Sequence, residues 1–125
     1  MKLSTISSIA TLLASATAAE WSMTNYVYKG KCDVDSDGTY RVYFGEDNKC
    51  HQFGPGDSGA SCRQFTDGGS HWTDDCDDEI NTSASVLIRH ANCKVFQNDD
   101  CTGDMKTGGE LDCVTGAFRS FLCNY

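Results

Sequence analysis

The sequence predicts a small, mostly β domain, built as an antiparallel sandwich or a Greek-key fold and stapled by disulfides. Three observations predict it: a short secretory leader, eight cysteines that all follow the leader, and short β-branched or aromatic segments separated by turn residues. Strong helix-forming runs are missing, and the chain has a single proline. With 125 residues in all, the mature part is expected to form one domain over residues 20–125.

Residues 1–19 have the pattern of a cleavable secretory signal peptide. Lys2 precedes an apolar segment, and small residues close the leader at Ala18 and Ala19. Serines and threonines interrupt the apolar segment, whereas a membrane-spanning helix needs about 20 apolar residues in succession. We therefore expect a secreted, extracellular protein without a membrane span, and a monomer.

Charge and length exclude several classes of function. The chain has 10 Lys and Arg against 18 Asp and Glu, and loss of Lys2 with the leader makes the net charge −9. A nucleic-acid-binding protein needs a basic face, which this composition does not supply. Barrel enzymes and dinucleotide-binding sheets need a longer chain. No nucleic-acid partner and no cofactor are expected.

The cysteines form an even set spread over the mature chain. In a secreted protein of this size, such a set predicts four disulfides, whose pairing the sequence does not decide. Zinc sites favour closely paired Cys-x-x-Cys motifs, which are missing here. The cysteines are Cys32, Cys50, Cys62, Cys76, Cys93, Cys101, Cys113 and Cys123.

Five segments rich in β-branched and aromatic residues are expected to form strands. A short helix over residues 83–90 is the alternative for one of them, but the β-branched Val86 and Ile88 favour a strand there. The expected strands cover residues 26–28, 40–44, 86–88, 94–96 and 118–122.

Residues 50–53, 62–65 and 93–96 repeat the pattern Cys-basic-x-Phe. On a strand the basic residue and the phenylalanine share one face, and the cysteine takes the other. Either face can be the buried one. We favour phenylalanine in the core, with the basic side chain extending from its edge to solvent.

Residues 85–123 resemble the Greek-key motif of the βγ-crystallin superfamily. In that motif an aromatic residue is followed after six residues by a glycine, and a serine follows in a later strand. Phe96 and Gly103 have this spacing, and Ser120 is the candidate serine. The resemblance implies a folded-over hairpin with its glycine at positive φ and the serine closing it. Small cysteine-rich secreted fungal proteins, both effector-like and killer-toxin-like, are similar in size, leader and cysteine placement.

Two acidic segments are weak metal candidates. Asp33, Asp35 and Asp37 alternate before a glycine, as at the start of a calcium loop. The last ligand of such a loop is a glutamate, and Phe44 stands at that position. We therefore interpret this segment as an acidic turn, and residues 74–79 as a solvated acidic loop.

No catalytic residue is expected. Gly56–Gly59 match the tetrapeptide around the serine of trypsin-like proteases, but that triad needs a larger scaffold, so a glycine-rich turn is favoured. His71 and His90 could be the acid and base of a small ribonuclease if they met beside a carboxylate in one cleft.

The sequence favours a secreted binding protein, a fungal effector or virulence factor that acts on a host outside the cell. The alternative is an antimicrobial or killer-type toxin, although toxins that attack anionic membranes are usually basic. A small secreted ribonuclease or hydrolase comes third. The expected partner is an extracellular protein or cell-surface component of a host or competitor.

Five residues are candidate sites on the exposed surface. Asn81 begins an Asn-Thr-Ser sequon, which predicts a glycan in a secreted protein. Candidate contact residues, expected on exposed turns, are Arg63, His71, Trp72 and Lys94.

Overall fold

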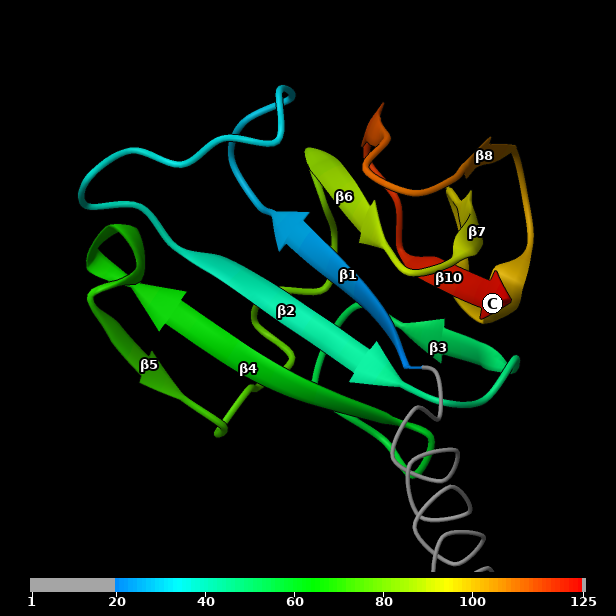
Figure 1. The fold of residues 1–125 in the computed structure, drawn as a ribbon, viewed down its shortest axis with the longest axis horizontal. Coiled ribbons are helices and arrows are strands. Elements are labelled where there is room, and N and C mark those ends of the chain that lie inside the picture. Colours follow the sequence, from blue (N-terminus) through cyan, green and yellow to red (C-terminus); the bar gives the residue numbers. More distant parts are fainter. Residues whose placement is uncertain (1–19, 125) are drawn as a thin grey trace, which may run out of the picture.

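The computed structural model describes residues 20–124, which form two antiparallel sheets and no α-helix (Figure 1). The leader, residues 1–19, lies outside the described residues. In the described part of the chain, no helix is long and apolar enough to cross a membrane. The strands are β1 (Trp21–Tyr26), β2 (Tyr40–Gly45), β3 (Cys50–Gln52), β4 (Ala60–Thr66), β5 (His71–Thr73), β6 (Ser85–Arg89), β7 (Asn92–Phe96), β8 (Met105–Gly108), β9 (Cys113–Thr115) and β10 (Ser120–Asn124); the 3₁₀ turns are η1 (Asp67–Gly69) and η2 (Asp99–Cys101).

The mostly β prediction is confirmed, and the strands expected over 40–44, 86–88 and 94–96 lie within β2, β6 and β7. Two expectations were wrong at their ends. The segment 26–28 is strand only at Tyr26, because the chain then leaves the sheet for the long connection to β2. The segment 118–122 begins as strand only at residue 120.

Phe118 explains the later start of β10. Its side chain is buried, but its backbone N–H and C=O form hydrogen bonds with Ser83 instead of with a neighbouring strand. The Phe118 carbonyl accepts the Ser83 N–H at 3.1 Å, and the Phe118 N–H donates to Ser83 Oγ at 3.1 Å. A hydrophobic pattern predicts the burial of such a residue, but not the partner of its backbone.

The two sheets contain the same four-stranded arrangement. The six-stranded sheet has the order β5-β4-β2-β1-β6-β9, and the four-stranded sheet has the order β3-β10-β7-β8. Thus β2-β1-β6-β9 corresponds to β8-β7-β10-β3. In each case the last strand comes from the other half of the chain, so the two halves exchange a strand and interlock.

The hairpin expected from Phe96 and Gly103 follows β7. Gly103 has φ of 83°, the left-handed conformation that a folded-over hairpin needs. Ser120 Oγ donates to the Asn98 carbonyl at 2.6 Å and accepts the Cys101 N–H at 2.8 Å. The serine therefore closes the hairpin, while a relationship to the crystallins stays a prediction.

A second, equivalent hairpin closes on Ser85. Ser85 Oγ donates to the Lys29 carbonyl at 2.6 Å and accepts the Cys32 N–H at 2.9 Å. Cys32 has a positive φ of 51°, and Cys101, its counterpart in the other hairpin, has a φ of 55°. Tyr26 on β1 pairs with Ser85 on β6, as the aromatic residue and the serine do in the other half. A hairpin closed by a serine thus occurs twice, once in each half of the chain.

Four disulfides confirm the predicted scaffold and give its pairing. Two of them join a hairpin cysteine of one half to the strand that the other half contributes to the same sheet. Such crosslinks restrict the unfolded chain, which is their main stabilising effect in a small domain. The pairs are Cys32–Cys113, Cys50–Cys101, Cys62–Cys76 and Cys93–Cys123.

The core lies between the two sheets, around Phe121. The Phe121 ring centroid lies 5.6 Å from those of Trp21 and Tyr43 and 4.8 Å from that of Phe53. All four aromatic side chains are almost completely buried. Their aromatic contacts join β1 and β2 of one sheet to β10 of the other.

The first half carries an extra hairpin. Residues 53–84 connect β3 to β6, whereas only residues 116–119 make the equivalent connection from β9 to β10. This insert contains β4 and β5, which extend the six-stranded sheet beyond β2 along one side of the molecule (Figure 1). The repeated arrangement is complete without the insert.

The insert is anchored by the fully buried Arg41. Arg41 Nη1 donates to the carbonyls of Asp77, Ile80 and Gly54 at 2.7, 2.9 and 3.3 Å. Its Nε donates to Gln64 Oε1 at 2.8 Å, and Nη2 to Asp77 Oδ1 at 3.0 Å. The guanidinium therefore joins the return loop after β5 to the segment after β3 and to β4.

Candidate binding surface

The structure brings two of the four candidate contact residues together. Arg63 on β4 lies over the ring of Trp72 on β5, with its Cζ 4.0 Å from the ring centroid. Arg63 Nε donates to Asp74 Oδ1 at 2.8 Å. Trp72 is 56% exposed, which is unusual for so large an apolar side chain. The result is an exposed indole with a fixed cation on one side.

His71 and Lys94 do not join this pair. His71 precedes Trp72 on β5, so its side chain points to the other face of the sheet, where Nδ1 lies 3.1 Å from Asp67 Oδ2. Lys94 is exposed on β7 of the four-stranded sheet. The expectation of turns was wrong for all four residues, because strands carry them: Arg63 lies on β4 and Lys94 on β7, both inside their sheets, and His71 and Trp72 lie on the edge strand β5.

Trp72 ends a row of four aromatic residues across the six-stranded sheet. Tyr26 pairs with Tyr40, Tyr40 with Phe65, and Phe65 with Trp72. Directly paired residues project from the same face. The Tyr26 and Tyr40 centroids are 5.9 Å apart, and those of Tyr40 and Phe65 are 4.9 Å apart. This face is the one turned away from the core, so the row forms a strip on the outside of the molecule.

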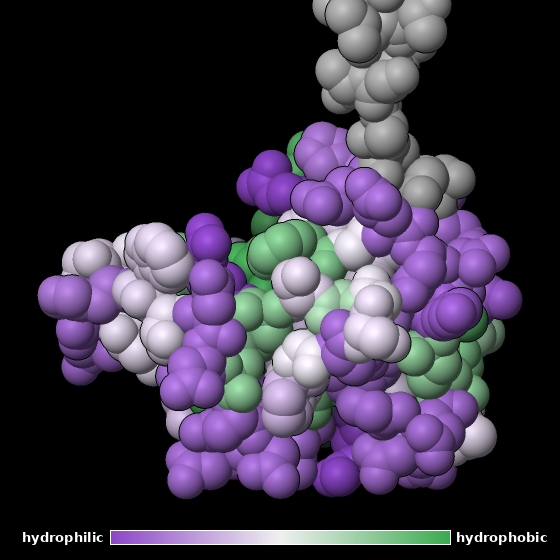
Figure 2. Space-filling view, turned by 90° about the horizontal axis from the view of Figure 1, so that it is seen from below, coloured by the Kyte–Doolittle hydropathy of each residue, from purple (hydrophilic) through white to green (hydrophobic). Residues whose placement is uncertain are grey.

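A hollow of about 420 Å³ adjoins the Arg63–Asp74 pair. Phe44 and Pro55 give it apolar walls, and Asp57 adds a carboxylate. Figure 2 shows one face of the molecule on which apolar surface gathers in the middle, framed by polar side chains. We call Phe44, Arg63, Phe65, Trp72 and Asp74 the hairpin surface.

The Cys-basic-x-Phe segments pack in two ways. In residues 62–65 and 93–96 the cysteine is buried and the basic and aromatic residues face outward, so the favoured packing was wrong there. Their cysteines face the core to reach disulfide partners. In residues 50–53 the cysteine turns outward to Cys101, and His51 and Phe53 are buried together.

His51 is a buried group that was not among the candidate residues predicted from the sequence. It is 3% exposed, and its ring lies against Trp21 with the centroids 5.5 Å apart. Its Nε2 lies 2.7 Å from Asp47 Oδ1, and its Nδ1 lies 2.9 Å from Asp57 Oδ1. Because ionised carboxylates only accept hydrogen bonds, both ring nitrogens must carry protons to satisfy both contacts.

The pKa values of this group move in the matching directions. Burial lowers the pKa of His51, but hydrogen bonds to Asp57 and Asp47 outweigh burial, and the pKa of His51 is raised. Burial raises the pKa of Asp57, but hydrogen bonds from His51 and from the Gly59 N–H outweigh it, and the pKa of Asp57 is lowered. The arrangement favours an imidazolium between two carboxylates.

The segment Gly56–Gly59 is a turn, as expected. The Asp57 N–H donates to the Ala60 carbonyl at 2.8 Å, and the Ala60 N–H returns to the Asp57 carbonyl at 3.3 Å. His51 contacts Asp57, the aspartate of the tetrapeptide, so the histidine stabilises this turn. The sequence signal was present in Asp57 itself, six residues after the histidine.

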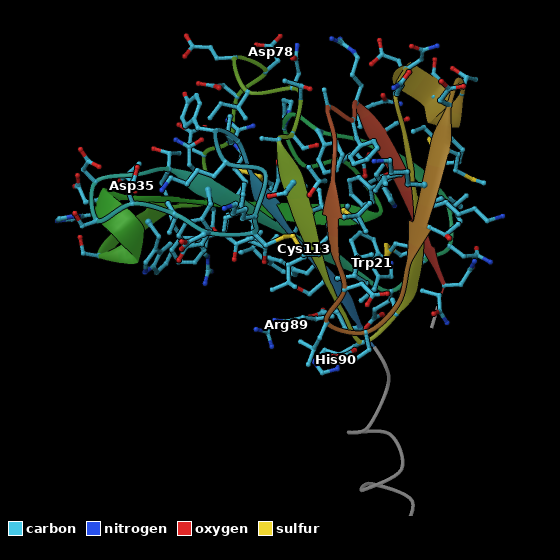
Figure 3. All side chains as sticks on the ribbon, turned by 90° about the horizontal axis from the view of Figure 1, so that it is seen from above. Trp21, Asp35, Asp78, Arg89, His90 and Cys113 are labelled. Atoms are coloured by element: carbon cyan, nitrogen blue, oxygen red, sulfur yellow. A yellow bond between two sulfur atoms is a disulfide. The ribbon has the colours of Figure 1, made fainter. Side chains whose placement is uncertain are left out.

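His71 and His90 lie on different parts of the six-stranded sheet. Three strands separate β5 from β6 in the sheet order, and His90 lies in the turn after β6. There its N–H donates to Glu110, and it stands beside Arg89 at one end of the molecule (Figure 3). These two histidines therefore do not form the acid–base pair considered for a ribonuclease.

The two acidic segments project from different loops, as Asp35 and Asp78 show in Figure 3. Asp35 Oδ1 accepts a hydrogen bond from the Lys29 ammonium at 2.6 Å, and Asp33 Oδ1 accepts the Val34 N–H at 2.8 Å. Within residues 20–124, no three His, Cys, Asp or Glu side chains are grouped so that they could hold a metal ion.

The model of the family "Secreted LysM effector LysM14, C-terminal domain" matches residues 21–121. The chain belongs to this family. The match begins with β1 and ends within β10, so it includes both sheets, the insert and the hairpin surface. The LysM14-type domain is thus a secreted effector domain with a disulfide-rich β fold. A search of the curated proteins and a search of the solved structures found no match.

Proposed function

We propose that this LysM14-type domain acts outside the producing cell by binding a host protein or cell-surface component through the hairpin surface. Secretion and an effector role hold for the family. The exposed Trp72 under the Arg63 guanidinium is the observation that carries the choice of surface.

Trp72 and Arg63 are the residue types that dominate binding interfaces. Tryptophan and arginine are enriched among residues whose loss costs the most binding energy. Arg63 is already held by Asp74, so less side-chain freedom is lost when a partner binds. The neighbouring hollow offers a place for a partner side chain beside this pair.

The position of the surface supports the same proposal. Trp72 and Arg63 lie on the insert, which the repeated arrangement does not need, and they are outside the core. Loops and additions to a rigid scaffold are where proteins usually carry binding residues. Binding without catalysis is our interpretation, because the candidate histidines are far apart in the sheet order.

Leaf infiltration of the purified, oxidised mature protein tests this proposal. A reduced and alkylated sample, which lacks the disulfide scaffold, is the control. We expect a defence or cell-death response in at least one plant of a panel, from the oxidised sample alone. Inhibition of microbial growth with no leaf response would instead support the antimicrobial alternative.

A further inference from the structure

Two cations hold the two ends of the insert. Arg41 holds the return loop and also the Gly54 carbonyl just after β3, and His51 holds the first turn through Asp57. Arginine stays charged at any physiological pH, whereas histidine loses its proton near neutrality. The two anchors therefore respond differently to pH.

The His51 anchor joins three segments. His51 lies on β3, Asp47 lies in the turn after β2, and Asp57 lies in the first turn of the insert. Asp47 and Asp57 are the charged groups in contact with the ring. From β1 and β10 the ring meets Trp21 and Phe121, which do not titrate.

The Asp47 and Asp57 carboxylates that contact His51, together the Asp47–His51–Asp57 bridge, also border a hollow of about 370 Å³. Glu20 and Glu46 line this hollow together with Asp47 and Asp57, so carboxylates face it from the start of β1 and from both turns. His51 lies buried behind them. Loss of its proton would remove the buried cation that lies between Asp47 and Asp57.

The first turn rests directly on the bridge. A side chain at Gly59 would collide with the Asp47 carboxylate, and its Cβ would lie 2.8 Å from His51 Cε1. The backbone of the turn also uses Asp57, whose Oδ1 accepts the N–H groups of Gly59 and Ala60 at 3.0 and 3.1 Å. A displaced Asp57 carboxylate would release both.

A neutral imidazole can donate from only one nitrogen, so the lone pair of the other would face a carboxylate. The Asp57 side chain is 47% exposed and that of Asp47 is 23% exposed. Asp57 can therefore turn to solvent at lower cost, which identifies its contact as the one that breaks.

We propose that the Asp47–His51–Asp57 bridge is a pH-operated latch that holds the first turn of the insert closed while His51 is protonated and releases it at higher pH. Because the folded-state pKa of His51 is raised, its contribution to stability is complete at acidic pH and is lost as the pH rises through that pKa. Because the pKa of Asp57 is lowered, its contribution is lost only in stronger acid.

Hydrogen exchange and NMR of the oxidised mature protein between about pH 5 and about pH 9 test the latch. We expect the protection factors of the Gly59 and Ala60 amides to fall at least about tenfold as the His51 ring resonances titrate. The Ala84 amide, which donates to Tyr26 on β1, should keep its protection. Constant protection at Gly59 and Ala60, or a neutral His51 ring at about pH 6, would overturn the proposal.

Asp57→Asn provides the matched variant, because Asp57 is exposed and the fold should tolerate the change. It should lower the His51 titration midpoint and remove the pH step in protection. Asp67→Asn, which removes the carboxylate beside the exposed His71, should leave that step unchanged. If the protection of the Gly59 and Ala60 amides in Asp57→Asn still fell with pH at the wild-type midpoint, the latch would be contradicted. No host component enters these measurements, so they are independent of the proposed binding function.

Discussion

The Arg63 guanidinium lies 4.0 Å from the centroid of the Trp72 ring, and its Nε donates to Asp74 Oδ1 at 2.8 Å. Exposed cation–π contacts and surface ion pairs each contribute little to stability. The trio therefore adds little to folding. It nevertheless fixes an aromatic and a charged group on the outer face, where a partner can reach both.

Ser85 and Ser120 should have similar effects on stability. Each Ser→Ala change removes two hydrogen bonds at a buried position, and we expect a loss of about 1–3 kcal/mol in each case. Denaturant unfolding of the oxidised protein measures it. Ser61→Ala, at an exposed position on β4, should change stability by less than about 0.5 kcal/mol.

A large effect at Ser120 with none at Ser85 would show that the two hairpins are not equivalent. The similarity of the two hairpins could not be recognised from the sequence. The C-terminal copy is short enough for Phe96, Gly103 and Ser120 to be noticed, whereas the insert separates β2 and β3 of the first copy from Ser85. Spacing motifs detect an element only while its parts stay close in the chain.

Arg41→Lys should destabilise the protein by about 3 kcal/mol, in the range found when one partner of a buried ionic network is lost. Lysine keeps the charge but cannot serve three carbonyls and Gln64 with one fixed fork. Asp78→Asn, at an exposed position of the same loop, is the control and should change stability by less than about 0.5 kcal/mol. Thermal unfolding measures the stability of both variants, and an equal loss of stability in the two would contradict the anchoring role of Arg41.

Asn81 should carry an N-linked glycan when the protein is secreted from a eukaryotic cell. The side chain is half-buried, and Ser83 of the sequon is buried, with its Oγ donating to the Gly116 carbonyl at 2.8 Å. The glycan must therefore be added before this segment folds. Intact mass before and after glycosidase treatment measures it. Asn81→Gln should abolish the mass difference and Asn92→Gln should preserve it; equal masses for the wild type would refute the glycan.

Fold class was predictable because it rests on local signals. Cysteine number, turn residues and β-branched runs are visible in the chain, and β2, β6 and β7 followed from them. The start of β1 was missed because Asn25 interrupts its apolar alternation, although it is buried and donates to the Thr82 carbonyl at 3.2 Å. Disulfide pairing depends on the strand exchange, which no local pattern encodes.

The site was predictable only in part. Arg63 and Trp72 were recognisable as candidate residues, but their contact depends on the register of β4 and β5, which also turns His71 to the other face. The bridge of His51 to Asp57 depends on how the insert begins. Side-chain partners across strands are decided by register and topology, which are properties of the whole fold.

The most direct test of the binding account compares Trp72→Ala with Lys94→Ala in leaf infiltration at equal concentration. Both residues are exposed strand positions, so both variants should keep the melting temperature of the oxidised wild type. We expect Trp72→Ala to need at least about tenfold more protein for the same response, whereas Lys94→Ala should match the wild type. A full response from folded Trp72→Ala would contradict it.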